Sequence, residues 1–579
     1  MPGGLPQLVE TAGTVDVQRT TLSIDALGRY ICSTWAEATQ NGGRPFDAVV
    51  VGSGMYGAYC AEKIWRFGAA KGLRVLVLEA GPFLISEHVQ NIADIGLNVP
   101  SALDPAQDPG VPRELVWGIA WRGNVAFPGL AYCVGGKSLY WGGWCPRLTA
   151  ADLQQWPAAT AAALQAQYPI VESETGVVPT TDFISGELFD ELTRAFAAQT
   201  GAVAHVDTNG GTNGIHEAPL AVQGAQPASG LFSFDKFSSA TLLAQAVRED
   251  VGAAGAQDRL RRLFLVPRAH VLRLAVTNGT VTGLDVAVAG RREFLPLNPA
   301  CSVVLAASAI ETTRLALVSF PRPPMGGNLM AHMRTDMTVR IRRTAFHPLP
   351  PDLETAALLI RGGTQQGRFH IQVTGSASRA LSSDGLLFRM VPDLDLLGGL
   401  LANDDPDWIA ITLRGIAEMT GDRSAPNRIP SRSWIDLSPA ENDEFGVPRA
   451  WVNLAVQPGE IALWGDMDHA MLDLCQRVAG SPANIEYLYD GGWQAVPYPL
   501  DRPFPPWHQG LGETYHEAGT LWMGDNPATS VTDPHGRFHH VANAYSCDQA
   551  AFPTVGSVNP VLTGLALARE MAEHITGLH

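Results

Sequence analysis

Short apolar runs that lead into glycine mark the beginning of the chain. Residues 48–51 read AVVV and continue as GSGMYGA, and residues 73–78 read LRVLVL and continue as EAGP. A short β-branched run bounded by glycine is typical of a strand buried on both faces of a parallel sheet. We therefore expect a strand, a glycine turn and a helix from residue 46, followed by a second strand that ends at Glu79.

Alternation of apolar and polar positions predicts antiparallel strands farther along. Residues 263–288 read LFLVPRAHVLRLAVTNGTVTGLDVAV, with an Asn-Gly pair at 278–279. An Asn-Gly pair between two alternating runs is a strong signal for a β-hairpin or meander. The segments RFHIQVTG (368–375) and RAWVNLAV (449–456) also read as strands. For residues 335–500 we expect an antiparallel sheet that floors a substrate cavity.

The first glycine turn has the chemistry of a nucleotide site. Gly52, Gly54 and Gly57 form G-x-G-x-x-G immediately after the first strand. Such glycines permit a tight turn, close approach of a pyrophosphate and close packing of the next helix, whose N-terminal amides face the phosphates. Glu79 lies at about the 20-residue spacing expected of the acid that binds a ribose 2′-hydroxyl. We predict an adenine dinucleotide here, and this unit alone leaves NAD and FAD open.

A second glycine cluster favours a flavin. Residues 129–148 read GLAYCVGGKSLYWGGWCPRL. Small residues in such a loop can bring backbone amides against a flat ring, which an isoalloxazine needs more than a nicotinamide does. A structural turn with aromatic packing is the alternative. The candidate cofactor contacts in this loop are Gly135, Gly136, Ser138, Trp141, Gly142 and Gly143.

Composition and charge narrow the function. With 579 residues the chain is too long for one ordinary core, so two or more lobes are expected. The formal net charge of −17 disfavours nucleic-acid and anionic-membrane partners. The seven cysteines contain no CxxC pair, which favours reduced, buried thiols in a cytoplasmic protein. We expect no signal peptide and no membrane-spanning segment.

The motifs together resemble the glucose–methanol–choline (GMC) flavin oxidoreductases. FDAVVVGSGMYGA, LVLEAGP and GGKSLYWGG are joined by VVLAASAIETTRLAL, GGNLMAHM, HEAGTLWMG and AYSCDQAAFPTVGSVNP, in the family's order. The resemblance implies an α/β + α+β fold with a Rossmann-type FAD-binding domain built from discontinuous segments. It also implies a substrate-binding domain based on an antiparallel sheet.

On this resemblance we expect six segments. Residues 1–45 would be an N-terminal arm with one short helix. The FAD-binding domain would comprise residues 46–155, 235–330 and 505–579, and the substrate-binding domain residues 156–234 and 331–504.

The resemblance also assigns the chemistry. Oxidation of an alcohol requires a base for the hydroxyl proton, an acceptor for the hydride and donors that hold the oxygen. His516 occupies the position of the family's catalytic histidine and would be the base, with flavin N5 as hydride acceptor. Asn559 would hold the substrate oxygen, where many relatives have a second histidine. Asn559 and Pro560 would open a helix whose positive end faces the flavin, and an N-cap role for Asn559 is compatible with this.

Further contacts come from the same resemblance. Val271 would present its backbone to the adenine, Asp548 would lie near the ribityl chain and pyrophosphate, and Phe552 would pass close to the flavin ring. Gln372 is a weaker candidate for a substrate contact, since an ordinary strand glutamine fits the pattern too. Pyranose oxidases, the branch that the chain resembles, often carry a covalent histidyl–flavin bond where this chain has Tyr140. We therefore predict non-covalent FAD.

Other functions remain open. His535, His539 and His540 match no metal-ligand spacing, so no metal site is expected. The leading hypothesis is oxidation of a secondary alcohol, on a sugar or glycoside, with oxygen or another electron acceptor. A GMC-type dehydrogenase of a non-sugar alcohol, a non-redox lyase or decarboxylase, and a flavin-binding protein without catalysis are the alternatives.

Overall fold

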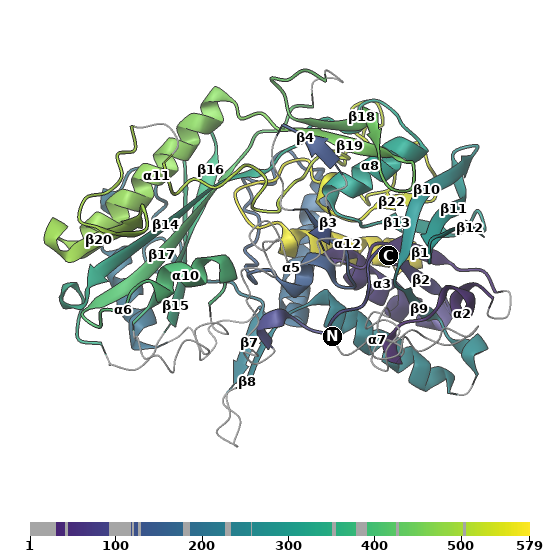
Figure 1. The fold of residues 1–579 in the computed structure, drawn as a ribbon, viewed down its shortest axis with the longest axis horizontal. Coiled ribbons are helices and arrows are strands. Elements are labelled where there is room, and N and C mark those ends of the chain that lie inside the picture. The colour runs from purple at the N-terminus through teal and green to yellow at the C-terminus, as the bar shows by residue number, and fades with distance from the viewer. Residues whose placement is uncertain are drawn as a thin grey trace, which may run out of the picture.

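The computed structural model describes most of the chain. It covers residues 30–40, 44–91, 117–118, 121–124, 129–177, 186–225, 233–255, 257–349, 355–377, 391–423, 428–501 and 505–578. Figure 1 shows a wide sheet with its helices on one side of the molecule and a smaller parallel sheet with its helices on the other. Within residues 1–45 the structure describes a short helix, α2 (Trp35–Thr39), and residues 1–29 lie outside the described part.

The parallel sheet is built from the glycine-bounded apolar runs. Its strand order is β22-β13-β1-β2-β9, with parallel pairing throughout. Every residue of β1, β2 and β9 is buried, which is why these strands read as unbroken β-branched and leucine runs. The strands are β22 (Ala544–Ser546), β13 (Ser302–Leu305), β1 (Ala48–Val51), β2 (Val75–Leu78) and β9 (Leu263–Val266).

Helices cover one face of this sheet, and a three-stranded meander with one further helix covers the other. Helix α3 packs against α12 and α7, and α12 also packs against α5. Across the sheet, a three-stranded meander and α8 bury a second apolar cluster. The helices are α3 (Met55–Phe67), α5 (Ala158–Thr175), α7 (Ser239–Ala254), α8 (Ala309–Ser319) and α12 (Val561–Thr576), and the meander strands are β10 (Ala269–Thr277), β11 (Thr280–Val288) and β12 (Arg291–Pro296).

The Asn-Gly hairpin prediction is confirmed. Asn278 and Gly279 connect β10 to β11 with φ angles of 50° and 74°. Positive φ at both central residues is the geometry whose twist matches that of the flanking strands, and Asn-Gly tolerates it best.

The second large sheet has seven strands in the order β21-β20-β14-β17-β16-β15-β6. Its long strands are antiparallel, with His332 of β14 opposite Glu418 of β17, and Gln372 of β16 opposite Arg414. The strands are β6 (Ile215–Glu217), β14 (His332–Arg342), β15 (Thr355–Gly363), β16 (Arg368–Ser376), β17 (Trp408–Glu418), β20 (Ile485–Tyr489) and β21 (Gly492–Gln494).

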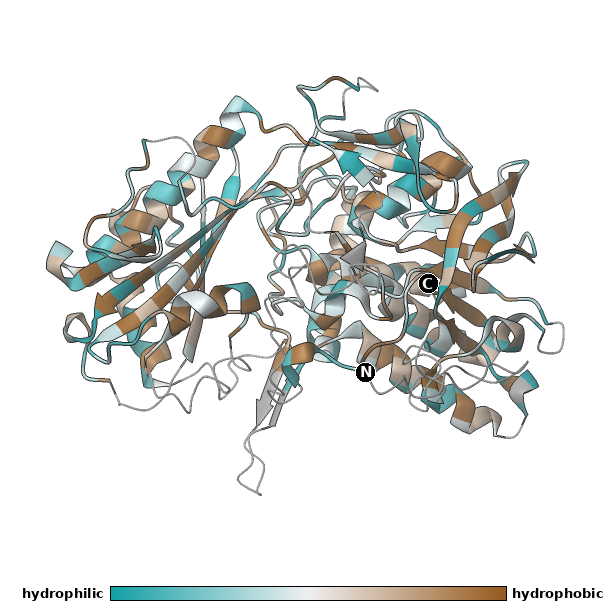
Figure 2. Ribbon diagram, in the orientation of Figure 1, coloured by the Kyte–Doolittle hydropathy of each residue, from teal (hydrophilic) through white to brown (hydrophobic). Residues whose placement is uncertain are grey.

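The two faces of this sheet differ sharply. Alternate residues of β14, such as Met333, Met337 and Val339, enter the apolar core that α11 (Pro458–Ala479) and α6 (Glu187–Ala197) help to form. The intervening residues are polar, because successive side chains of a strand point to opposite faces. Figure 2 shows this mixture of hydrophobic and hydrophilic positions along the long strands. The polar face carries His332, Arg334, Asp336, His370, Gln372 and Arg414.

Smaller elements complete the described structure. Strand β19 (Pro448–Asn453) pairs with β18 (Trp434–Asn442) on one side and with β4 (Trp121–Gly123) on the other, and both β18 and β19 contact α8. RAWVNLAV and RFHIQVTG therefore belong to different sheets, where the sequence suggested one. The remaining elements are β3 (Trp117–Gly118), β5 (Leu130–Ala131), β7 (Val222–Ala225), β8 (Ser233–Lys236) and α10 (Leu397–Leu401).

Three further expectations concern the last helix, the cysteines and membrane-spanning helices. The last helix begins at Val561, one residue later than expected, with Pro560 in the preceding cap position and no side-chain cap. The N-cap interpretation of Asn559 is therefore wrong. All seven cysteines are buried. Among the described residues, no helix is both long enough and apolar enough to cross a bilayer.

Asp250 in α7 joins three elements of the parallel-sheet unit. Its carboxylate accepts hydrogen bonds from Trp65 Nε1 of α3 (2.9 Å) and from the backbone N–H groups of Arg262 (2.8 Å) and Leu263 (3.0 Å), at the edge strand β9. We predict that Asp250→Ala lowers the free energy of unfolding by about 3 kcal/mol, because buried donors lose their acceptor. The neighbouring Glu249→Ala is the control, since that side chain is 41% exposed. Urea unfolding curves measure both, and equal losses would contradict this role for Asp250.

Candidate active site

The three glycines of the turn between β1 and α3 differ in the space around them. At Gly52, with φ of +96°, an added Cβ would lie 2.5 Å from the Ala306 carbonyl oxygen. At Gly57 it would lie 2.1 Å from the Gly52 carbonyl oxygen, so the helix could not pack as closely. At Gly54 it would meet nothing within 4 Å. Gly52 and Gly57 are therefore required by the fold itself, whereas Gly54 leaves an open cradle at the start of α3.

That cradle fits a pyrophosphate. Helix α3 begins after Gly54 without a side-chain cap, so its first N–H groups have no partner from a capping side chain. Such groups and the helix dipole favour an anion. The residues present thus fit the phosphates of a dinucleotide.

Glu79 at the end of β2 faces this turn. Its Oε2 accepts from Ser53 N (3.0 Å) and Ser53 Oγ (2.7 Å), and its Oε1 accepts from Gly81 N (2.9 Å). Burial raises the pKa of Glu79, and these donors oppose the rise. A carboxylate has about four acceptor positions, so Oε1 keeps capacity for a further hydroxyl donor.

The second glycine loop lies directly beside the first. Gly135 N donates to Ser53 O (3.0 Å), and a Cβ at Gly136 would lie 3.2 Å from the Cα of Gly54. Gly142 is equally tight, since its Cβ would lie 2.1 Å from Asp393 Oδ1, and Gly143 has φ of +89°. The structure therefore brings together the two clusters that the sequence singled out.

Two side chains of this loop are engaged within the protein. Ser138 is fully buried, and its hydroxyl donates to Gly135 O (2.7 Å) and contacts Ser238 Oγ (3.0 Å). Trp141 Nε1 donates to Phe237 O (2.7 Å). These bonds shape the loop and leave its backbone as the surface that a ring could contact.

Asp548, Val271 and Phe552, three further candidate cofactor contacts, also belong to the parallel-sheet unit. Asp548 is buried, accepts from Thr312 Oγ1 (2.5 Å) and Ala550 N (2.9 Å), and burial raises its pKa to about 6. Val271 is buried in β10, and the ring of Phe552 packs on Trp156 with centroids 5.2 Å apart. Any cofactor contact of Phe552 would therefore involve its backbone.

His516 is tied to a second histidine, His332, that sequence reasoning did not select. His332 Nε2 lies 2.8 Å from Gly556 O, and its Nδ1 lies 2.8 Å from His516 Nδ1. A carbonyl oxygen only accepts, so His332 carries its proton on Nε2 and its Nδ1 accepts when the ring is neutral. His516 must then donate from Nδ1. Its Nε2 is left with a lone pair and no partner among the described residues.

Asn559 is oriented by a parallel chain of bonds. His370 Nδ1 donates to Ser557 O, so its neutral ring accepts at Nε2, where Gln372 Nε2 donates (3.0 Å). The same amide nitrogen donates to Asn559 Oδ1 (2.7 Å). With its oxygen occupied by Gln372, Asn559 keeps its NH₂ group as a donor.

The residues that support His516 and Asn559 are more deeply buried than His516 and Asn559 themselves. His332, His370 and Gln372 are 1%, 0% and 2% exposed, whereas His516 and Asn559 are half-buried. Burial lowers the pKa of His332 to about 4 and that of His370 to about 3. The pKa of His516 is held well below its usual range by burial first and then by nearby His332, His370, Arg414 and Arg334. All three rings are thus neutral near pH 7.

Charged groups occupy the polar face of the sheet beyond these residues. Asp336 accepts from Arg334 Nε and Arg414 Nε, each at 2.9 Å, and Arg414 Nη2 also reaches Asp395 (2.8 Å). Arg334 Nη1 donates to Glu513 O (3.1 Å), three residues before His516. The paired guanidinium groups hold the pKa of Asp395 well below its usual range, although its side chain is 49% exposed.

The other histidines form no comparable site. His535 Nδ1 contacts Glu570 Oε1 (2.7 Å), His539 Nε2 contacts Ser530 Oγ (2.9 Å), and His540 Nε2 contacts Phe320 O (3.2 Å). Within the described ranges, no group of three or more His, Cys, Asp or Glu side chains is arranged to hold a metal ion.

Comparisons with known proteins relate the chain to a family of oxidoreductases. Residues 430–568 match the family model described as GMC oxidoreductase. The chain is 25% identical over 91% of its length to C-glycoside 3-oxidase from Microbacterium trichothecenolyticum, of which 96% is covered. It is 26% identical over 93% of its length to paromamine 6'-oxidase from Streptomyces fradiae, of which 93% is covered.

Solved structures share the fold. Pyridoxine 4-oxidase from Mesorbium loti matches with a TM-score of 0.54 and 17% identity, over 91% of this chain and 99% of that one. Formate oxidase from Aspergillus oryzae RIB40 matches with a TM-score of 0.59 and 15% identity, over 92% of this chain and 98% of that one.

The contrast between Gly54 and Gly57 can be tested directly. We predict that Gly54→Ala leaves the unfolding transition of the cofactor-free protein unchanged but weakens retention of the dinucleotide by about tenfold or more, because the methyl group fills the cradle. Gly57→Ala should destabilise the cofactor-free protein itself by about 1–3 kcal/mol, because α3 must move away from β1. Denaturant unfolding and equilibrium dialysis against FAD separate the two effects. An unchanged affinity for FAD in Gly54→Ala would exclude the cradle as the phosphate site.

Proposed function

We propose that this chain, which belongs to the GMC oxidoreductases and is therefore an FAD-dependent enzyme acting on CH–OH groups, oxidises a secondary hydroxyl of a sugar or glycoside to a ketone with His516 as the base. The first two relatives support the substrate class, because their names state oxidation of a C-glycoside at position 3 and of paromamine at position 6'. Sequence identity to both extends over nearly the whole chain.

The residues that would hold FAD come from five segments. Gly54 and the N-terminus of α3 would take the pyrophosphate, Glu79 a ribose hydroxyl, and the backbone of the Gly135–Gly143 loop the ring system. Asp548 and the backbone of Val271 would complete the contacts. When bound, FAD supplies the acceptor for the hydride that leaves the carbinol carbon.

The observation that carries this proposal is the pair of hydrogen-bond chains behind His516 and Asn559. His516 offers a lone pair at Nε2 and Asn559 offers N–H donors. An alcohol that loses its proton needs both, because one group removes the proton and the other holds the oxygen as negative charge develops. Mere binding of a flavin would require neither chain, which disfavours the flavin-binding protein without catalysis.

The buried histidines favour a base that is ready at neutral pH. A neutral His516 accepts the hydroxyl proton at Nε2, and Nδ1–H continues to donate to His332. His332 cannot release a compensating proton to solvent easily, because it is buried and its Nε2–H is committed to Gly556 O. The imidazolium that forms is therefore a stronger acid than free histidine, so it returns its proton readily in a later step.

The polar face of the sheet supports a hydroxyl-rich substrate. Arg334, Asp336, Asp395 and Arg414 form alternating ion pairs that leave the Asp395 side chain half exposed. Carboxylate oxygens of this kind accept hydrogen bonds from sugar hydroxyls, whereas a simple aliphatic alcohol would gain nothing from them. A GMC-type dehydrogenase of a non-sugar alcohol, or a lyase on the same scaffold, is less well supported for this reason.

We propose non-covalent FAD. The loop that resembles the histidyl attachment segment of pyranose oxidases has Tyr140 at the matching position. The histidine beside this loop, His88, is fully buried, with Nε2 at 2.9 Å from Trp141 O and Nδ1 accepting from Gln90 N at 3.1 Å. Both of its ring nitrogens are occupied, so it offers no attachment atom.

The substrate class can be tested by anaerobic mixing of the flavin-loaded enzyme with sugars, C-glycosides, aminoglycosides and simple secondary alcohols. We expect a sugar or glycoside to remove the visible absorbance of the oxidised flavin, and a ketone to be found by mass spectrometry. Reoxidation with oxygen or a quinone then identifies the electron acceptor. Ketone formation only from simple alcohols would overturn the substrate class, and product without any change in flavin absorbance would favour the lyase alternative.

The base and its support can be tested with matched variants. We expect His516→Ala to lower the rate of flavin reduction by about 100-fold or more. His332→Leu should lower it by about 10- to 100-fold with little change in KM, because His516 loses the acceptor that fixes its tautomer. His332→Gln keeps an acceptor oxygen and should retain most of the rate.

The pH dependence gives an independent readout. Because the pKa of His516 lies well below its usual range, its neutral, active form persists as pH falls. The reduction rate should therefore stay flat from about pH 8 down to about pH 6, where an ordinary histidine would already be half protonated. A rate that declines with a midpoint near the usual histidine pKa would show that the buried pair does not control this base.

A further inference from the structure

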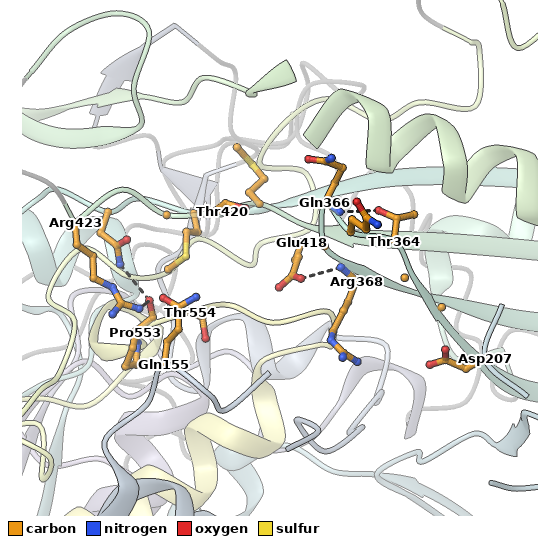
Figure 3. Close-up of a pocket in the computed structure, with 18 residues that line it drawn as sticks. Gln155, Asp207, Thr364, Gln366, Arg368, Glu418, Thr420, Arg423, Pro553 and Thr554 are labelled. Carbon is orange, nitrogen blue, oxygen red and sulfur yellow. Dashed lines mark hydrogen bonds between the residues drawn. The ribbon is translucent and has the colours of Figure 1, made fainter. Parts of the chain in front are cut away.

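A separate cavity of about 440 Å³ opens at the end of the seven-stranded sheet. Figure 3 shows it between Arg423, Gln155 and Thr554 on one side and Arg368 and Glu418 on the other. Its inner wall includes the buried Asn328 and Pro553, and its outer part includes the exposed Gln365, Gln366 and Thr420.

Two arginines line this cavity and make no ion pair with a described residue. Arg423 Nη2 donates to Pro553 O (2.6 Å). Burial lowers the pKa of the Arg423 guanidinium, as expected of a desolvated cation that no carboxylate compensates. Two acids line the cavity as well. Asp207 is exposed, and Glu418 accepts from the backbone N–H of Arg368 (2.8 Å), where burial raises its pKa to about 7 and the nearby Arg368 opposes the rise. Arg423 is therefore the cation of this cavity that is best suited to an anionic ligand.

The inner wall also offers an unused acceptor. Asn328 is 1% exposed, and its Nδ2 donates to Gly519 O and Pro553 O, each at 3.3 Å. Its Oδ1 is buried without a partner. Gly421 faces this oxygen, and a Cβ there would lie only 2.0 Å from it, so a larger residue would collide with the acceptor. A buried acceptor without a partner is costly, and a ligand with a hydroxyl group would satisfy it.

These groups are neighbours, because Arg423 and Asn328 both donate to the Pro553 carbonyl. The remaining N–H groups of Arg423 can therefore donate to a ligand, and Asn328 Oδ1 beside them can accept from it. A carboxylate with a hydroxyl on the adjacent carbon presents the complementary pair. None of the residues that line the cavity in the described chain is aromatic, which disfavours a quinone or a stacked sugar ring.

We propose that this cavity binds a small 2-hydroxy acid, with its carboxylate on Arg423 and its hydroxyl on Asn328 Oδ1. Arg368, on the opposite wall, takes a second carboxylate. The cavity is distinct from the proposed active site, since neither His516 nor Asn559 lines it. The proposal does not depend on which alcohol the enzyme oxidises.

The test uses the full-length, flavin-loaded protein and citramalate. This probe carries two carboxylates and a tertiary hydroxyl, so its carbinol carbon has no hydrogen to lose and it cannot be turned over. Isothermal titration calorimetry should show one site per chain. Arg368→Gln and Arg423→Gln should each weaken binding by about tenfold or more, because each removes a charge-assisted hydrogen bond. Arg291→Gln, an exposed position on β12, is the matched control and should bind as the wild type does.

Methylsuccinate, which has the same carboxylates without the hydroxyl, tests the acceptor. It should bind about tenfold more weakly than citramalate, because Asn328 Oδ1 stays unsatisfied. Flavin content and thermal melting show whether each variant is folded, and Arg368→Gln breaks no bond within the described protein. Absence of binding at millimolar citramalate, or wild-type affinity in both arginine variants, would overturn the proposal. Equal affinities for the two acids would overturn the assignment of the hydroxyl to Asn328.

Discussion

Two successive carbonyl groups, those of Gly556 and Ser557, control the protonation pattern of the candidate active site. Gly556 O accepts from His332 and Ser557 O accepts from His370. Because a carbonyl oxygen only accepts, each fixes one ring tautomer. The tautomer of His332 makes His516 donate from Nδ1, which leaves a lone pair on His516 Nε2. The tautomer of His370 makes its Nε2 accept from Gln372, whose amide nitrogen also donates to Asn559 Oδ1. One short loop thus defines both a base and a donor.

This control depends on the registry of the seven-stranded sheet. His332 opens β14 and His370 lies two residues into β16, with β17 between them. Side chains alternate between faces, so a shift of one residue in either strand would turn its histidine into the apolar core beneath α11. The opposite face of β14 and β16 is fully committed to that core, through residues such as Met333 and Ile371. Packing on one side of the sheet therefore positions the chemistry on the other.

Part of this arrangement could be predicted from the sequence. Glycine spacing predicted the β1–α3 turn, the Asn-Gly pair predicted the β10–β11 hairpin, and a motif resemblance selected His516 and Asn559 as candidates. The supporting residues were not predicted, because their partners are remote in the chain. His332 contacts a residue 184 positions away, and Gln372 reaches Asn559 across 187 positions. Local patterns report the face on which a strand residue lies, and they do not report which carbonyl it meets. Gln372 was singled out for the substrate, and in the structure its amide nitrogen is committed to Asn559 and His370.

The same loop connects the proposed active site to the second cavity. Pro553 O, three residues before Gly556, accepts from Arg423 and Asn328, and Thr554 lines the cavity. The loop is therefore held along its length by side chains of the sheet and of the segments that flank it. A carboxylate bound to the remaining Arg423 N–H donors would lie beside Pro553 O, three residues along the chain from the carbonyl that sets the tautomer of His332. Because hydrogen-bond geometry is steep in distance and angle, small shifts of this backbone change the base more than equal shifts of an unconstrained loop would. A ligand in this cavity would therefore contact the same loop whose carbonyls orient His516 and Asn559.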